Sequence, residues 1–188
     1  MVEKAIGASK MEQKNRNVSP FSNEARNAYV TEHITQSVLK LLKEKPLNDI
    51  SISEIVDDAA VGRTSFYRNY KTKEDVIKKH IEHLIGVWEQ EYKTSGKDSN
   101  AELYGSLFEH LKNHADFFLL LKERNLMHLF LEVFIEKSGP KPEDVNMWAY
   151  TKSFIAYGTY GWIEEWIARG MQESAETMAE LLSSHGMK

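Results

Sequence analysis

The sequence of 188 residues contains no cysteine and only four prolines. Without cysteine the chain has no disulfide, no thiolate metal site and no cysteine nucleophile. No apolar run approaches the roughly 20 residues that a membrane span requires, and the polar N-terminus lacks the apolar core of a signal peptide. We therefore expect a cytoplasmic protein without membrane contact. No pattern in the sequence calls for a cofactor.

Strand-like alternation of apolar and polar residues is also missing. Apolar side chains instead recur every three or four residues, which is typical of helices packed on one face. After a long helix from Lys73 to about Tyr92, such patterns lie at about 100–114, 116–122, 124–137, 143–169 and 174–185. We expect an all-α protein.

The segment from Ser51 to Val76 is the most informative part of the chain. Ser51 followed by Glu54 is a capping-box signature, so a helix should begin there. Its apolar pattern breaks before Gly62, which marks a turn, and resumes with Phe66 and Tyr70 one helical turn apart. This spacing predicts two short helices around a tight turn.

The second of these helices leaves a polar, cationic face outside. Arg63, Thr64 and Ser65 in its first turn carry donors and acceptors that suit base edges, while Tyr67, Arg68 and Asn69 suit phosphate oxygens. Thr72 is a plausible cap for the next helix, and its free amides beside Lys71 and Lys73 would form a phosphate clamp. The face has the chemistry of a DNA reader.

At these residues the sequence resembles the DNA-binding domain of the tetracycline-repressor (TetR/AcrR) family of bacterial transcription regulators. The resemblance implies an N-terminal three-helix helix-turn-helix domain, followed by a larger helical domain for ligand binding and dimerisation. It implies base contacts for Arg63, Thr64 and Ser65, and backbone contacts for the residues Ser53, Tyr67, Asn69 and Lys73.

Two positions depart from the family pattern, which usually has Gly where Ala60 stands and a Ser-like cap where Gly62 stands. If the turn needs a positive φ at position 60, Ala60 carries a strain of roughly 1–2 kcal/mol that Gly would avoid.

Charge is distributed unevenly along the chain. Residues 1–80 hold 14 Lys and Arg against 11 Asp and Glu, whereas residues 81–188 hold 10 against 17. The front half therefore suits an anionic partner. We expect a flexible extension over 1–24, the DNA-binding domain over 25–72 and the regulatory and dimerisation domain over 73–188. Within the extension, Lys10, Lys14 and Arg16 form either a minor-groove arm or a solvated tail.

The segment from Ala149 to Leu182 resembles a regulatory-domain ending common in TetR-like proteins of Gram-positive bacteria. It implies a homodimer in which the last two helices pair with their copies. Two glycines would allow close approach and three apolar residues would face the partner; the implied interface residues are Gly158, Gly161, Met178, Leu181 and Leu182.

Aromatic and methionine side chains gather in the C-terminal half. They either line a pocket for a small-molecule effector or form the core; the candidates for the pocket are Phe108, Phe117, Met127, Phe130, Trp148, Phe154 and Tyr157. The pairs His80/His83 and His110/His114 have a spacing that can chelate a cation, but we favour ordinary surface or core histidines.

Two functions fit the sequence. The first is a ligand-responsive homodimeric repressor that binds a palindromic DNA operator. The alternative is a TetR-like co-activator or adaptor that acts through protein contacts without DNA. The cationic face around Arg63 favours the repressor. We expect no enzyme, because the sequence has no phosphate loop, nucleophile elbow or HExxH motif.

Overall fold

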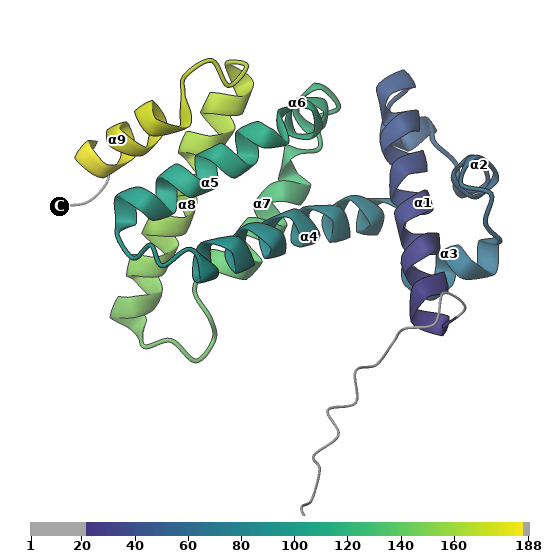
Figure 1. The fold of residues 1–188 in the computed structure, drawn as a ribbon, viewed down its shortest axis with the longest axis horizontal. Helices are drawn as coiled ribbons and strands as arrows, with labels where there is room; N and C mark the ends of the chain where they lie inside the picture. Colours follow the sequence, from purple (N-terminus) through teal and green to yellow (C-terminus); the bar gives the residue numbers. More distant parts are fainter. Residues whose placement is uncertain (1–21, 186–188) are drawn as a thin grey trace, which may run out of the picture.

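The computed structural model describes residues 22–185, and these residues contain helices but no strand. The all-α prediction is confirmed. The elements, drawn in Figure 1, are α1 (Asn23–Glu44), the 3-10 turn η1 (Leu47–Asp49), α2 (Ile52–Asp58), α3 (Arg63–Asn69), α4 (Lys73–Thr94), α5 (Asn100–Asn113), α6 (Ala115–Glu123), α7 (Met127–Ser138), α8 (Asn146–Ala168) and α9 (Ala175–His185). The proposed N-terminal arm with Lys10, Lys14 and Arg16 lies outside the described residues.

Helices α1 to α3 form a small unit, which we call the head. Ile34, Val38 and Leu42 recur along one face of α1 and are fully buried. They pack with Ile55 of α2 and Phe66 of α3, both also fully buried. This core is small, but it fixes the three helices because each contributes at least one large apolar side chain.

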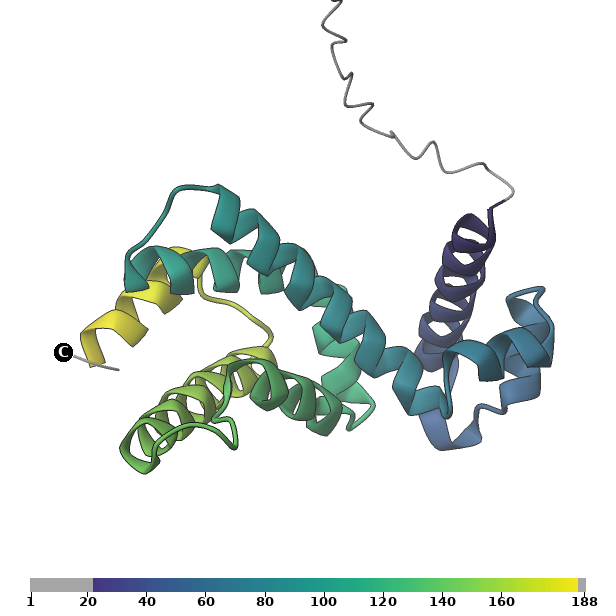
Figure 2. The ribbon, with the colours of Figure 1, turned by 90° about the horizontal axis from the view of Figure 1, so that it is seen from below.

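The helix α4 connects the head to the remaining helices, α5 to α9, which we call the body. It begins just after α3, with Thr72 as its cap residue. It then runs along the body in both views (Figures 1 and 2). Its apolar face, with Ile77, Ile81 and Leu84, is buried. One rigid helix therefore touches both units.

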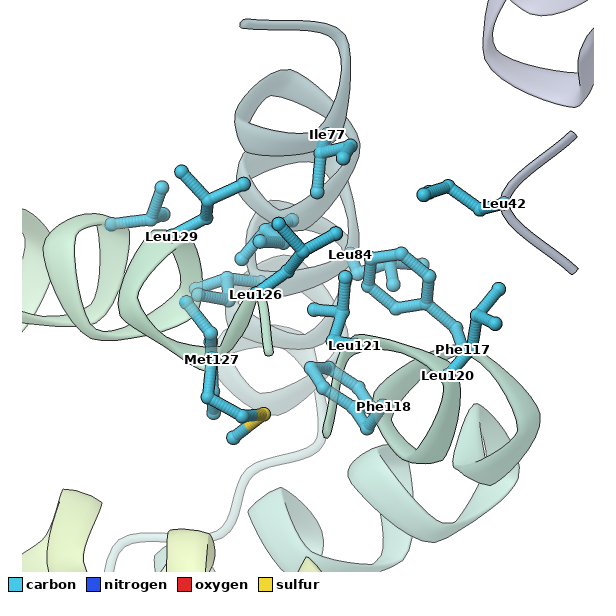
Figure 3. Packing of buried hydrophobic residues seen from close by; sticks show 14 of the residues in the cluster. Leu42, Ile77, Leu84, Phe117, Phe118, Leu120, Leu121, Leu126, Met127 and Leu129 are labelled. Carbon is cyan, nitrogen blue, oxygen red and sulfur yellow. The ribbon is translucent and has the colours of Figure 1, made fainter. Parts of the chain in front are cut away.

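Packed aromatic rings fill the body. Phe118 lies 5.1 Å from Phe130, and Phe130 lies 5.7 Å from Tyr160, measured between ring centroids. Phe108 meets Trp166 edge to face at 5.3 Å. Figure 3 shows the apolar side chains of α4, α6 and α7 converging beside Leu42 of the head. The core is thus continuous from body to head.

Short-range signals in the sequence placed most helix ends. Both predicted caps, Ser51 and Thr72, are capping boxes in the structure. Pro46 follows the end of α1, as its fixed φ and missing amide hydrogen lead one to expect. Within residues 22–185, no helix is long and apolar enough to cross a membrane.

Candidate nucleic-acid interface

The helix α2 supports α3. The Ser51 hydroxyl accepts from the Glu54 amide at 3.2 Å, and the Glu54 carboxylate accepts from the Ser51 amide at 2.9 Å. The Lys45 ammonium, together with the Ser51 amide, lowers the pKa of Glu54 to about 2. On the inner side, the buried Ser37 hydroxyl donates to the Ile55 carbonyl at 3.0 Å, which ties α2 to α1.

The inner face of α3 is anchored in the head. Phe66 is fully buried and Tyr70 is 4% exposed, with their rings 5.7 Å apart. Because these two residues fix the rotation of the helix about its axis, the opposite face must lie in solvent. The inward direction predicted for Phe66 and Tyr70 is confirmed.

The outer face of α3 carries the predicted contact residues. Arg63, Thr64 and Tyr67 are exposed, and Ser65 and Asn69 are half-buried. The Arg63 guanidinium donates to the Ser53 hydroxyl of α2, so these two candidates lie side by side at the edge of the turn. Arg63, Thr64 and Ser65, the residues predicted to contact bases, therefore lie together in the first turn of α3, with the Arg63 side chain held by Ser53.

Asn69 and Arg68 make contacts inside α3. The Asn69 amide donates to the Ser65 carbonyl at 2.9 Å, and the Arg68 guanidinium reaches the Ser65 hydroxyl at 3.3 Å. One of the two N–H groups of the Asn69 side chain thus already has a partner within α3.

Ala60 occupies the turn between α2 and α3 with φ of 52°. This is the left-handed region, where an L-residue with a Cβ is strained and glycine is not. The turn therefore does need a positive φ at position 60, and Ala60 carries the strain that glycine would avoid. Gly62, which precedes α3 as its cap residue, has an ordinary φ of −77° and needs no glycine.

At the start of α4, a side chain of the same helix occupies amides that were predicted to bind an anion. The Asp75 carboxylate accepts from the amides of both Lys71 and Thr72 at 2.9 Å. The Asp75 amide in turn donates to the Thr72 hydroxyl at 3.2 Å. The amides of Lys71 and Thr72 are therefore not free for a phosphate, and the negatively charged Asp75 carboxylate lies beside them. The Lys71 side chain itself is exposed.

Lys73 has a different role from the predicted one. Its ammonium donates to the backbone carbonyls of Leu47 and, at 2.9 Å, of Ile50, with Asn48 at 3.2 Å. These carbonyls belong to η1 and its flanks, so Lys73 joins the start of α4 to the α1–α2 connection. In this structure the predicted phosphate contact is replaced by a structural one, because three acceptors of the same chain surround the cation.

Sequence reasoning missed a cleft next to α3. It has a volume of about 650 Å³ and lies between the N-terminal part of α1 and α3, lined among others by Arg26, Tyr29 and Arg68. Tyr29 is 55% exposed, and its ring lies 4.0 Å from that of His33 at a tilt of 38°. Arg26 belongs to a helix that otherwise supports the core, so only the fold reveals that it lies near Ser65.

Comparisons with known proteins agree with this geometry. Residues 34–79 match the family model described as "Bacterial regulatory proteins, tetR family", and residues 98–185 match "Transcriptional regulator C-terminal region". Together the two matches cover both the head and the body. The chain belongs to the TetR family of transcriptional regulators. Members of this family regulate transcription and are not enzymes.

Individual relatives are more distant. Over 104 residues the chain is 27% identical to "Uncharacterized HTH-type transcriptional regulator YerO" of Bacillus subtilis (strain 168); this covers 51% of the chain but only 36% of YerO. The crystal structure of a TetR transcriptional regulator from Streptococcus agalactiae 2603V has the same fold, with a TM-score of 0.58 and 16% identity. The match covers 88% of this chain and 97% of that one.

A second surface of this TetR-family chain lies on α8. Tyr150, Phe154 and Tyr157 are 66%, 71% and 52% exposed and follow one another at helical spacing. Gly158 and Gly161 lie on the same face, and a Cβ added to either would meet no atom within 4 Å. The opposite face of α8, with Ile163 and other residues, is buried in the body. A helix that is apolar on both sides is expected to be covered on both sides.

The three interface residues predicted on α9, Met178, Leu181 and Leu182, differ in exposure. Met178 and Leu182 are only 5% and 6% exposed because they pack in the body, where α9 lies along α5. They have little surface left for a partner, so their assignment to a dimer interface is corrected to core. Leu181 is 37% exposed and lines a hollow between α8 and α9 together with Trp162.

The predicted effector residues do not form one site. Phe108, Phe117, Met127 and Phe130 are buried in the body core, whereas Trp148, Phe154 and Tyr157 are exposed on α8. Of the two alternatives left open for these residues, the first four therefore lie in the core and the other three on the surface, so the seven do not line one pocket in this structure. The reason is that the polar residues of α8 form no continuous stripe, so periodicity could not tell its inner face from its outer one.

The histidine pairs are packed rather than arranged around a cation. His110 and His114 have ring centroids 4.7 Å apart, and His80 meets Phe117 edge to face at 4.8 Å. Among residues 22–185, no group of three or more potential ligands is placed to hold a metal ion.

Proposed function

We propose that this TetR-family regulator is a ligand-responsive homodimeric repressor that inserts α3 into the major groove of a palindromic operator. The observation that carries the proposal is the exposed face of α3, with Arg63, Thr64 and Tyr67, on a helix held from behind by Phe66 and Tyr70. A rigidly held helix with outward donors is the geometry of helix-turn-helix readers. Such a regulator would act in the cytoplasm, with the chromosome.

Dimerisation would follow from the size of the reading surface. One short helix covers too few base pairs for a useful site, so two must be held about 34–36 Å apart, roughly one turn of the duplex. The exposed apolar face of α8 supports pairing with a second copy. Phe154 and Tyr157 supply area there, and Gly158 and Gly161 allow the two helices to approach closely.

Control by an effector would act through α4. This helix begins in the head at Lys73, and its apolar face is buried against the body, so a ligand that favours one body arrangement would shift the spacing of the two heads. A coupling free energy of about 1–3 kcal/mol would change operator affinity roughly 5- to 150-fold.

The alternative function is that of an adaptor which has lost DNA binding. The observation against it is the exposed Arg63 side chain, supported by Ser53, together with the exposed Arg68 and Lys71 further along the same segment. A head used only for protein contacts would have no need of this cationic edge.

Binding-site selection from random duplexes tests the proposal. We expect an enriched pseudo-palindrome whose affinity falls with salt by roughly 0.9 log unit per log unit of salt for each phosphate neutralised. Arg63→Ala should relax preference at one position, at a cost of about 1–3 kcal/mol. Lys137→Ala, an exposed lysine of the body, is the control and should bind as the wild type does. No enriched motif, together with no binding to heparin or DNA at low salt, would favour the adaptor.

A further inference from the structure

The exposed face of α8 is bulky in its N-terminal half and nearly flat in its C-terminal half. Exposed residues follow one another along it mostly at intervals of three or four, so they lie on one side of the helix. In the first half, each more than half exposed, they are Met147, Tyr150, Phe154 and Tyr157. In the second half they are Gly158, Gly161, Glu165 and Ala168. Large side chains thus occupy one end of the face, and small residues, apart from one glutamate, occupy the other.

An apolar hollow between α8 and α9 adjoins the flat end. Its volume is about 370 Å³, and its lining includes Gly161, Trp162, Met178 and Leu181. A Cβ added to Gly161 would meet no atom within 4 Å, so the missing side chain leaves this space open. An apolar cavity of about 150 Å³ holds benzene. The hollow is therefore large enough for the phenyl ring of a phenylalanine.

Phe154 has the spacing that fits this hollow in a second copy. It lies two turns before Gly161 on the same face, about 10 Å away along the helix axis, which is too far to fill the hollow of its own chain. Around a twofold axis, each contact between two different residues occurs twice. Two antiparallel α8 helices centred between Tyr157 and Gly158 set Phe154 opposite the partner's Gly161 and Tyr157 opposite the partner's Gly158. Each ring then meets a residue without a side chain.

The direction of the Phe154 side chain adds to this fit. Long side chains of a helix lean toward the N-terminus of that helix. Because the partner helix runs the opposite way, the Phe154 ring leans from the partner's Gly161 toward the partner's Glu165. Both of these residues line the hollow. The ring is therefore directed over the hollow and not away from it.

The same register accommodates the other bulky residues. In helix bundles, which cross at about 20°, contact continues beyond the centre of the helix pair. Met147 then lies opposite the partner's Ala168. Tyr150 lies opposite the partner's Glu165, whose carboxylate accepts a hydrogen bond from a phenol. A parallel pair would instead set each large residue against its own copy and leave the small residues across a gap, so the antiparallel pair fits better.

The area of this face is also sufficient. From roughly 150–250 Å² for each aromatic side chain, the four bulky residues expose roughly 500 Å² in one copy and about 1,000 Å² in two. A specific interface buries at least about 1,000 Å² in total. Without counting the lining of the hollow, the face therefore reaches the size of a stable contact between two copies.

We infer that, in the dimer, Phe154 of each copy inserts into the α8–α9 hollow of the other copy, beside its Gly161. This inference rests on the proposed homodimer, to which it adds the antiparallel register and the occupant of the hollow.

The test is a double-substitution cycle in the full chain, with the dimer dissociation constant measured by analytical ultracentrifugation. Phe154→Ala removes the ring and Gly161→Leu fills the hollow, so each should weaken dimerisation roughly tenfold or more. In the double variant each leucine faces the alanine of the other copy. It should therefore dimerise roughly tenfold more tightly than Gly161→Leu alone.

Phe154→Ala combined with Ala168→Leu is the matched control. Ala168 is exposed on the same face but lies opposite Met147, so this pair should show no recovery relative to Ala168→Leu alone. Recovery in the Phe154→Ala, Gly161→Leu chain does not arise from misfolding, because that chain carries both substitutions.

The outcomes separate this inference from the proposed dimer. A dimeric wild type with additive losses, or with equal recovery in the control, would overturn the inference and leave the dimer intact. A Gly161→Leu variant that dimerises like the wild type would overturn it too and leave the hollow to a small apolar ligand. A monomeric wild type would refute both the inference and the proposed dimer.

Discussion

Arg124, at the end of α6, donates from Nε to the backbone carbonyl of Leu42 at 2.6 Å, and from Nη2 to that of Lys43 at 2.7 Å. These carbonyls belong to the last turn of α1, which has no intrahelical partners for them. A residue of the body thus caps a helix of the head. The head and the body are thus connected both by α4 and by this contact. The Leu42 side chain itself lies on the side of Phe117 and Leu120 of the body (Figure 3).

Replacing Arg124 with Met should destabilise the fold. The substitution keeps the aliphatic stem but removes two hydrogen bonds from a charged donor, so we expect a loss of about 2–4 kcal/mol in the free energy of unfolding. Urea unfolding followed by circular dichroism measures it. Lys122→Met, at an exposed position of the same helix, should change stability little. Equal effects of the two substitutions would show that the cap contributes nothing.

Ala60→Gly should stabilise the protein. At φ of 52° the Cβ of Ala60 is strained, and removing it should raise the free energy of unfolding by about 0.5–1 kcal/mol after the entropy of the freer unfolded chain is subtracted. The neighbouring Ala59 has an ordinary φ of −74° and is buried. Ala59→Gly should therefore destabilise. Thermal melts of both variants check the prediction, and two shifts of the same sign would contradict it.

Substitution of Lys73 should lower the stability of the fold, whereas substitution of Lys71 should weaken DNA binding. Lys73→Ala removes the cation that holds the η1 carbonyls and should cost about 1–3 kcal/mol of stability. Lys71→Ala removes an exposed charge; it should leave stability within about 0.5 kcal/mol and flatten the salt dependence of DNA binding by about one phosphate. Melting curves and salt titrations distinguish them. If Lys73→Ala melts like the wild type, its contacts to η1 carry no weight.

Stability should fall between pH 6.5 and about 4 because of His80. Burial, followed by the charges of His83 and His114, lowers the pKa of His80 from 6.5 to about 4. The unfolded chain therefore binds a proton in this window that the folded chain does not, so the stabilising contribution is complete above pH 6.5 and is lost as the pH falls. His80→Gln should flatten the profile of unfolding free energy against pH. His128→Gln, at an exposed position of α7, should leave its slope unchanged. A wild-type slope in His80→Gln would rule out this origin.

Local signals explain what the sequence could predict. The caps at Ser51 and Thr72 and the anchors Phe66 and Tyr70 depend on residues three or four apart, so they are visible without a fold. The partner of Lys73 lies 23 to 26 residues away, at η1, and no spacing rule connects the two. From the sequence alone, Lys73 was only a basic residue at the start of a helix, which is why it was predicted to contact phosphate.

The outer and inner residues of α8 show the same limit. Its apolar side chains leave no polar stripe to mark solvent, so Phe154 and Tyr157 could not be told from core residues such as Tyr160. On α9, by contrast, core residues were predicted to lie on the surface. Met178 and Leu182 were assigned to a partner because nothing in the sequence indicates that α5 lies against them.

The central claim is that two copies, paired through α8, present two α3 helices to one operator. Native mass spectrometry of the protein, alone and with a selected duplex, tests it most directly. We expect a dimer at micromolar concentration and two protomers per duplex. Phe154→Asp should give a folded monomer that no longer binds the duplex, whereas His128→Asp should remain dimeric. A monomeric wild type, a single protomer per duplex, or an unaffected Phe154→Asp would contradict the account.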